Sequence, residues 1–309
     1  MVDIFLKTIP FFALIALGWG AGRAGFFTRE ATAWLTKFVF YFALSAMLFR
    51  LAASLNFRDL FDLRFVAAYI LGSSTIWLLG FSVARAKGRP VAEAAMEAQT
   101  GITGNTGFLG VPLLVALIGE RAVGPLLLVL TIDMVVFSTA ITLIISSARE
   151  GRFTLSRVPQ LLLSVAKNPM IVSMVLGLGW SFLDIPLWQP IVEFLTLLGG
   201  ASTPGALFAI GASLAATVPD RPVPALWLSF EKLVLHPAAV AVSALLLFHV
   251  DRFPATVMIA AAALPVAGNL YMLAQYFQVA VRRVSTAILL STIGSIVTFP
   301  LVIHWILQG

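Results

Sequence analysis

Long apolar segments recur along the chain, and they limit it to folds in which most side chains face hydrocarbon. Charge-poor segments occupy 65–84, 98–119, 122–148, 194–219, 253–281 and 284–307. Each can cross a bilayer core as an α-helix, which takes roughly 20 residues. The chain of 309 residues is 60% hydrophobic and 11% charged, with a mean hydropathy of +0.99. A soluble protein of this length needs a more polar surface, so we predict an all-α polytopic membrane protein.

The pattern divides into ten predicted membrane helices. They lie at about 4–22, 32–52, 63–85, 93–118, 122–147, 165–182, 190–216, 224–249, 254–277 and 284–307. We interpret the first as a retained helix, because Asp3 and Lys7 make a weak basic start and no small-residue cleavage site follows. The second is short if it ends before Arg50, and the ninth can divide near Pro265.

The distribution of basic residues predicts the orientation. With the N-terminus outside, the inner loops carry 14 of the 20 Lys and Arg residues and the outer side carries 6; if Lys232 belongs to a helix, the inner count is 13. Cytoplasmic loops are typically the basic ones. We expect both termini outside an inner (plasma) membrane and the segment 149–167 in the cytoplasm. The net charge of +6 is accounted for by these loops, and no nucleic-acid partner is expected.

The chain also repeats itself. The stretch MLFRLAASL at 47–55 matches ALFAIGASL at 206–214 in five positions, and the Gly-Asn pair at 104–105 matches another at 268–269. Because such matches keep one order, we predict two repeats of five helices. Five is odd, so the second copy enters the membrane from the opposite side, which gives inverted repeats.

The stretches GITGNTGFLGVP (101–112) and LPVAGNLY (264–271) fall in the matching fourth and ninth helices. Gly costs about 1 kcal/mol against Ala in a helix interior, and Pro removes a backbone donor. In lipid, broken helices survive only inside protein or beside a water-filled cavity. Two matching breaks indicate the substrate site of a carrier. For Gly107 and Gly110, simple close packing of helices is the alternative. A phosphate loop is excluded, since no GKS or GKT follows.

Several motifs resemble the auxin efflux carrier family in the compact form of its bacterial members. They are GNTGFLGVPLL (104–114), KNPMIVSMVLGLG (167–179), STPGALFAIGASLA (202–215), EKLVLHPAAV (231–240), AAALPVAGNLYMLAQYF (261–277) and STAILLSTIGSIVTFPL (285–301). The resemblance runs from about residue 5 to the C-terminus. It implies one membrane unit, 1–309, built from inverted repeats 1–150 and 160–309, with the fourth and ninth helices crossing. The fold of the bile-acid/sodium symporters is similar.

The resemblance also implies that some helices form a fixed scaffold and the others form a moving transport domain. Scaffold helices at about 4–52 and 165–216 would offer a homodimer surface, and transport-domain helices at about 63–147 and 224–307 would move as an elevator. Ser45 stands where the family commonly has Pro in the second helix, and Gly104 stands where plant members have Pro before the Asn.

Three ionisable residues within predicted spans have two interpretations each. Placing an ionised Asp133 at mid-membrane costs about 2.5–3.5 kcal/mol or more. Asp133 therefore either carries a coupling proton or pairs with a helix break. Lys232 and His236, four apart on one helix face, form an anion-attracting or protonatable pair near the site. Alternatively, Lys232 extends to the cytoplasmic boundary and His236 makes a structural hydrogen bond.

These patterns predict a secondary carrier of a small organic anion, such as a mono- or dicarboxylate or an auxin-like carboxylate, working by alternating access. Half-helix N-termini at the breaks favour a carboxylate, and the Asn side chains can cap the breaks or bind its polar head. The predicted substrate-binding residues are Gly104, Asn105, Thr106, Pro265, Gly268 and Asn269, with Asp133, His236, Lys232 and Ser45 as coupling or accessory residues. Apolar neighbours such as Phe108, Leu270 and Tyr271 would hold the hydrocarbon part.

Two other classes of function stay open. One is a membrane enzyme that uses Asp133 and His236 as acid and base, although no catalytic motif supports it. The other is a passive anion channel. No His, Asp or Glu group has metal-ligand spacing, the chain has no Cys, and we expect neither a metal nor a cofactor.

Overall fold

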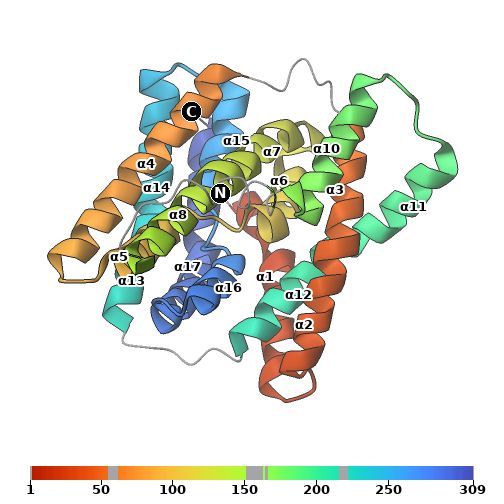
Figure 1. Cartoon of the computed structure of the whole chain (residues 1–309). Helices are drawn as coiled ribbons and strands as arrows, with labels where there is room; N and C mark the ends of the chain where they lie inside the picture. Colours follow the sequence, from red (N-terminus) through yellow and green to blue (C-terminus); the bar gives the residue numbers. More distant parts are fainter. Residues whose placement is uncertain (1, 55–61, 151–162, 164–165, 216–221, 309) are drawn as a thin grey trace.

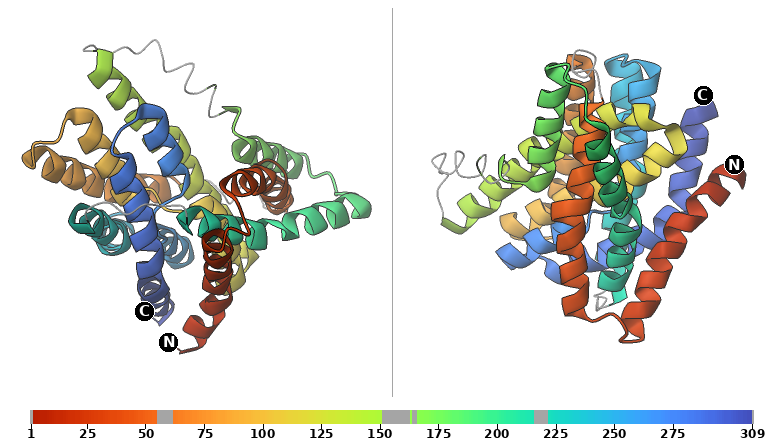
Figure 2. Two further views of the ribbon diagram at one scale, coloured as in Figure 1. Left: turned by 90° about the horizontal axis from the view of Figure 1, so that it is seen from below. Right: turned by 90° about the vertical axis from the view of Figure 1, so that its right-hand side faces the viewer.

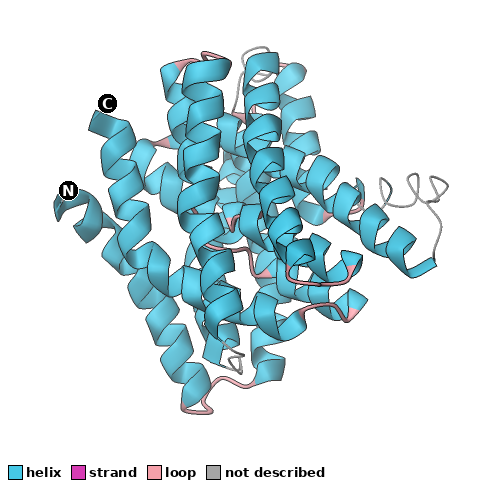
Figure 3. Ribbon diagram, turned by 90° about the vertical axis from the view of Figure 1, so that its left-hand side faces the viewer, coloured by secondary structure: helices cyan, strands magenta, loops and turns pink. Residues whose placement is uncertain are grey.

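The computed structural model describes residues 2–54, 62–150, 163, 166–215 and 222–308, and this part of the chain folds into helices and loops without a named strand (Figure 3). The helices of the first half are α1 Val2–Arg23, α2 Arg29–Phe38, α3 Leu44–Ala53, α4 Leu63–Ala86, α5 Val91–Ile102, α6 Val111–Ile118, α7 Val123–Ile132 and α8 Ser138–Glu150. Those of the second half are α10 Pro169–Phe182, α11 Gln189–Gly200, α12 Ser202–Ala215, α13 Pro222–Phe230, α14 His236–Ala241, α15 Arg252–Ala262, α16 Asn269–Phe277 and α17 Val281–Gln308.

Several of these labels are parts of one longer helix joined by a π-helical turn. One such turn, Val39–Ala43, connects α2 to α3. A second, Asp133–Phe137, connects α7 to α8, and a third, Glu231–Leu235, connects α13 to α14. Another at Thr106–Gly110 leads directly into α6. π-Helical turns are rare and frequently lie at functional sites, and two of these contain Asp133 and Lys232.

Local sequence explains where several helices begin. The Thr28 side chain accepts a hydrogen bond from the N–H of Ala31 at the start of α2. In the same way, Asp62 accepts from Arg64 at the start of α4, and Asn168 accepts from Met170 at the start of α10. Such N-caps satisfy backbone donors that have no partner within the helix. Pro169 then occupies the first helical position, where its missing N–H costs nothing.

Seven helices in the described part of the chain are long and apolar enough to cross a membrane. They are Phe5–Arg23, Arg29–Ala53, Leu63–Ala86, Glu120–Ala148, Gln189–Ala215, Val223–Leu247 and Val281–Leu307. Three shorter apolar helices, Thr106–Ile118, Pro169–Phe182 and Arg252–Ala262, correspond to the other three predicted spans. The sixth is short, and the fourth and ninth are interrupted. An all-helical protein with several membrane-spanning helices is therefore confirmed.

The helices pack in two groups that meet in the middle (Figure 1). α1 runs along α12, and α3 packs against α10 and α11. α4 packs against α5 and α14, while α13 and α15 pack against α17. A buried cluster that includes Leu48, Leu127 and Met170 joins the first group to α7. The first and last helices, α1 and α17, also lie side by side (Figure 2).

Most of the segment 149–167, expected in the cytoplasm, lies outside the described residues, as do Arg58 and Arg221 of the charge count. The inside and outside faces therefore remain a prediction from the basic residues.

Candidate functional site

The two Gly- and Pro-containing stretches interrupt their helices at the centre of the fold. α5 ends at Ile102, and the next helical turn begins at Thr106. α15 ends at Ala262, and α16 begins at Asn269. The interruption in the ninth predicted span thus includes Pro265, as its sequence indicates.

The two interruptions lie against each other as short antiparallel extended segments. Gly104 pairs with Val266. The N–H of Asn105 donates to the Pro265 carbonyl at 2.9 Å, and the N–H of Ala267 donates to the Thr103 carbonyl at 3.1 Å. The Ser291 hydroxyl in α17 accepts from the Val266 N–H at 3.0 Å. This pairing satisfies backbone groups that a broken helix would otherwise leave exposed to an apolar interior.

The helical turn after the first interruption presents its N-terminus at this pairing. The Asn105 carbonyl accepts from the N–H groups of Leu109 and Gly110, at 3.1 and 2.9 Å. Thr106, the first residue of the turn, is 1% exposed, and its hydroxyl has no hydrogen-bond partner among the described residues. The N-terminus carries a positive partial charge. A buried hydroxyl without a partner at that position is available to a ligand.

The expectation that the Asn side chains cap the half-helices is wrong. The Asn105 side chain makes no cap hydrogen bond, and the N-cap of α16 is Gly268, also without a side-chain bond. Backbone pairing satisfies the N–H groups of Asn105 and Ala267, whereas the first N–H groups of the Thr106 turn receive no side-chain cap. Asn105 is 5% exposed, whereas Gly268 and Asn269 are exposed. The predicted site therefore has a buried side at Asn105 and an accessible side at Asn269.

Lys232 lies directly behind the first interruption. Its Nζ would be 3.4 Å from a Cβ placed on Gly104, so a larger residue at Gly104 would crowd the ammonium group. Nζ donates to the carbonyl of Ala262, the last residue of α15, and contacts His236 Nδ1 at 3.2 Å. A cation at a helix C-terminus is stabilised by the helix dipole. Because Lys232 is fully buried, the interpretation that it extends to the cytoplasmic boundary is wrong.

His236 links Lys232 to the middle of α4. Its Nε2 lies 2.9 Å from the Ser73 hydroxyl, and its ring packs edge-on against Tyr69 at 6.1 Å between ring centroids. An ammonium group can only donate, so Nδ1 accepts from Lys232 and the neutral ring carries its proton on Nε2, facing Ser73.

Asp133 joins the same polar cluster through Tyr69 of α4. Its carboxylate accepts from the Tyr69 hydroxyl at 2.9 Å, and Tyr69 and Ser73 are one turn apart in α4. Asp133 is 6% exposed, and its charge acts on Lys232. The expectation that Asp133 pairs with a helix break is wrong, since its partner is the Tyr69 side chain.

The structure thus brings Asp133, Lys232 and His236 into one buried cluster beside Gly104, Asn105, Thr106 and Pro265. Ser45 lies elsewhere, where its hydroxyl donates to the Phe40 carbonyl at 3.1 Å in the π-helical part of the second span. Phe108 stacks against Phe40 with a centroid distance of 6.0 Å. Leu270 is buried and Tyr271 is 39% exposed.

Sequence reasoning missed Tyr69, Ser73 and Ser291, each of which holds part of this site. Tyr69 and Ser73 are polar residues four apart in an apolar helix, which places them on one face. That spacing is a usable signal, and Ser291 has no comparable one. The packing interpretation of Gly107 and Gly110 fits their surroundings, because a Cβ there would lie 2.5 Å from Met170 and Leu264, respectively.

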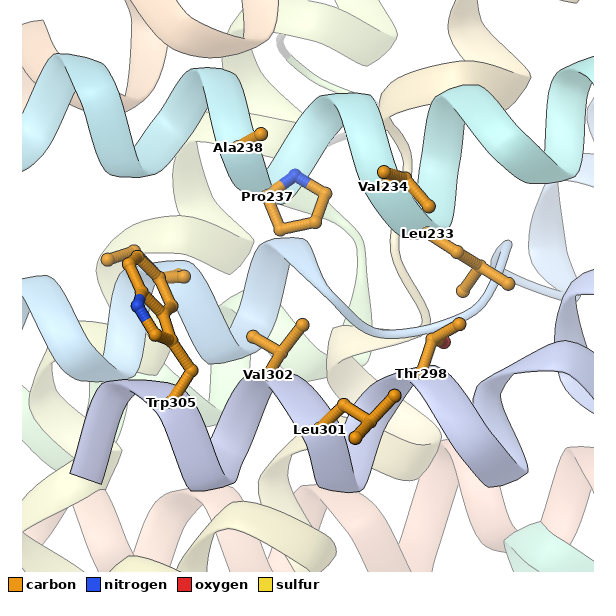
Figure 4. Close-up of a pocket in the computed structure, with 9 residues that line it drawn as sticks. Leu233, Val234, Pro237, Ala238, Thr298, Leu301, Val302 and Trp305 are labelled. Atoms are coloured by element: carbon orange, nitrogen blue, oxygen red, sulfur yellow. The ribbon is translucent and has the colours of Figure 1, made fainter. Parts of the chain in front are cut away.

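A groove in the described part of the chain is separate from this cluster. It lies between the eighth predicted span and α17 and is lined by Leu233, Val234, Pro237, Ala238, Ile259, Thr298, Leu301, Val302 and Trp305 (Figure 4). Its lining is almost entirely apolar and includes none of the predicted site residues. Among the described residues, no group of three or more His, Asp or Glu side chains can hold a metal ion.

A bundle of membrane-spanning helices with a buried polar cluster beside two interrupted helices is typical of polytopic membrane transporters. The chain belongs to the family described as "Membrane transport protein", whose model matches residues 3–303. This family is that of the auxin efflux carriers, so the resemblance seen in the motifs is confirmed.

Two relatives cover essentially the whole chain. A protein of Rhizobium meliloti (strain 1021) named "Putative malonate transporter" is 29% identical over 316 residues, covering 100% of this chain and 98% of the relative. The "Uncharacterized transporter YfdV" of Escherichia coli (strain K12) is 27% identical over 317 residues, covering 98% of each.

Proposed function

We propose that this protein is a secondary carrier of small organic anions, with short mono- and dicarboxylates as its substrate class. One observation carries the proposal: a fully buried ammonium group, Lys232, lies at two paired helix interruptions beside the helix N-terminus at Thr106. Both features favour negative charge. The relative named as a malonate transporter supports a dicarboxylate.

The donors around the interruptions suit one carboxylate group. Lys232 has three N–H donors, two of which go to Ala262 and His236, so one remains for a ligand. The Thr106 hydroxyl and the first N–H groups of its turn add neutral donors. Asn105 and Asn269 supply amide donors on the buried and accessible sides. A low local dielectric strengthens each of these bonds.

The proposed architecture is two inverted repeats of five helices, whose fourth and ninth members cross at the Gly104–Val266 pairing. The scaffold would consist of the first, second, sixth and seventh spans and would form a homodimer. The other spans would carry the site across the membrane as an elevator. Support comes from the antiparallel pairing of the interruptions and from the packing of α1 on α12 and of α3 on α10. Both termini would lie outside.

An enzyme that uses Asp133 and His236 as an acid–base pair is less well supported. The two side chains have different partners, Tyr69 for Asp133 and Ser73 with Lys232 for His236. The family and its relatives are named for transport.

The test is a thermal-shift screen of purified protein against acetate, malonate, succinate and indole-3-acetate, followed by counterflow in proteoliposomes. A ligand that binds only the folded state raises the melting temperature. We expect a saturable shift with at least one carboxylate and accelerated uptake of that compound by vesicles loaded with it. Non-saturating flux without counterflow would instead establish a channel.

A further inference from the structure

Glu231 is a buried acidic residue that the anion site does not use. It begins the π-helical turn Glu231–Leu235, immediately before Lys232. Its side chain is fully buried. Trp227, one turn earlier, is its neighbouring donor, but neither carboxylate oxygen has a hydrogen bond of ordinary geometry from the described residues. Buried acidic side chains are otherwise paired or hydrogen-bonded in nearly all proteins.

Two glycines make the space that this carboxyl group occupies. A Cβ on Gly80 of α4 would lie 3.1 Å from Glu231 Oε1, and a Cβ on Gly101 of α5 would lie 3.1 Å from Oε2. Any larger residue at either position would press on the carboxyl oxygens. The carboxyl group therefore sits in a close-fitting space between two helices that also form the proposed site.

The charges around Glu231 do not neutralise it. On α5, Glu97 adds a second negative charge; it is itself paired with Arg283 at 2.7 Å and Arg89 at 3.7 Å. Arg283 also pairs with Glu93. Lys87, at the end of α4, is the basic residue that acts on Glu231, but its side chain is exposed and lies over the Trp227 ring at 5.6 Å.

Lys232 is next in sequence, yet its ammonium group is committed elsewhere. It donates to Ala262 and His236, and the charge that acts on it is that of Asp133. The negative charge of Asp133 thus partly offsets the positive charge of Lys232. Among the described residues, this leaves the exposed Lys87 as the counter-charge of Glu231. An ionised carboxylate without a close partner is costly in a membrane interior.

We propose that Glu231 is a proton-binding site that holds its proton in this conformation and releases it in another, so that one proton accompanies each anion. The carboxylate gains the proton as a neutral carboxylic acid and returns it as a free proton, with no other bond changed. Trp227 and the exposed Lys87 mark its route to one face. Because Glu231 and Lys232 are consecutive in one π-helical turn, anion binding at Lys232 is transmitted to Glu231. The coupling rests on the proposed function; the protonation does not.

The protonation is tested on purified protein by infrared spectroscopy. A buried protonated carboxyl group gives a C=O band that is separate from those of carboxylates. We expect this band in unaltered protein, shifted by ¹³C-labelled glutamate and not by ¹³C-labelled aspartate, and absent from Glu231→Gln. Labelling alone distinguishes Glu231 from Asp133 if the variant does not fold. A band absent from unaltered protein at every pH where it stays folded would refute the proposal.

The coupling is tested in proteoliposomes with malonate and the membrane potential held at zero. A pH difference of one unit drives about tenfold accumulation if one proton accompanies each anion, since equal concentration ratios carry equal free energy. We expect Glu231→Gln to exchange malonate normally but not to accumulate it, whereas Glu193→Gln, the matched control at an exposed glutamate of α11, still accumulates it. Accumulation of malonate by Glu231→Gln would overturn the coupling. If unaltered protein moves no carboxylate, the proposed function fails while the infrared result stands.

Discussion

Replacement of Lys232 with Met tests the anion site directly, because it removes the ammonium group and keeps an unbranched side chain of similar length. A hydrogen bond to a charged group contributes about 1.5–3 kcal/mol, so its loss predicts carboxylate binding weaker by about 10- to 150-fold. Thr106 and the helix N-terminus still act in the variant, which is why some affinity should remain.

The same substitution has opposing effects on stability. The Ala262 carbonyl and His236 Nδ1 lose their donor, at about 1–3 kcal/mol for each unsatisfied group. Against this, a buried charge no longer has to be desolvated. The net change in the free energy of unfolding should therefore be smaller than the sum of the two losses, and the protein should remain folded.

The assay is isothermal titration of purified protein with the carboxylate that gives the largest thermal shift. Lys37→Met is the matched control, since Lys37 is exposed on α2 and lies over the Trp34 ring; it should bind normally. If folded Lys232→Met binds the carboxylate within about twofold of unaltered protein, a difference of under 0.5 kcal/mol, the ammonium group does not contact the anion and the placement of the site is wrong.

Three further predictions concern the same site and the orientation of the chain. Asn105→Ala and Asn269→Ala should each weaken carboxylate binding by about 5- to 150-fold, and the double variant should lose less than the sum because both contact one ligand. Thr106→Val should leave the melting temperature equal or higher, since it removes a buried hydroxyl without a partner, and should weaken binding by about 2- to 10-fold. With no native Cys, Lys87→Cys should resist an impermeant thiol reagent in intact cells, whereas Asp251→Cys should react.

Each of these has a result that would contradict it. Near-native binding in both Asn variants would move the site away from the interruptions. A lower melting temperature for Thr106→Val without ligand would show that the hydroxyl has a structural partner. Rapid labelling at Lys87→Cys with protection at Asp251→Cys would invert the topology. A cysteine at Ser156, on the segment 149–167, is a further probe of the same face, although it lies outside the described residues.

The positions of the helices and their interruptions follow from the sequence because both depend on local properties. Hydropathy over about 20 residues identifies a span, and Gly and Pro weaken a helix wherever they stand. Thus the stretches around Gly104 and Pro265 were recognisable as breaks before any contact was known. The family was recognisable for the same reason, since its motifs are contiguous.

The contacts of the polar side chains are decided only by the tertiary structure. His236 and Ser73 are 163 residues apart, and their meeting depends on how α4 and α14 are rotated against each other. Lys232 had an equally plausible position at the membrane boundary; it is buried because Gly104 and the end of α15 leave room for its ammonium group and supply an acceptor. The surroundings of Glu231 could not be read from its place in the motif EKLVLHPAAV, because they are made by glycines on two other helices. Sequence therefore determined the spans and the breaks, whereas the packing of those spans determined which charges face the site.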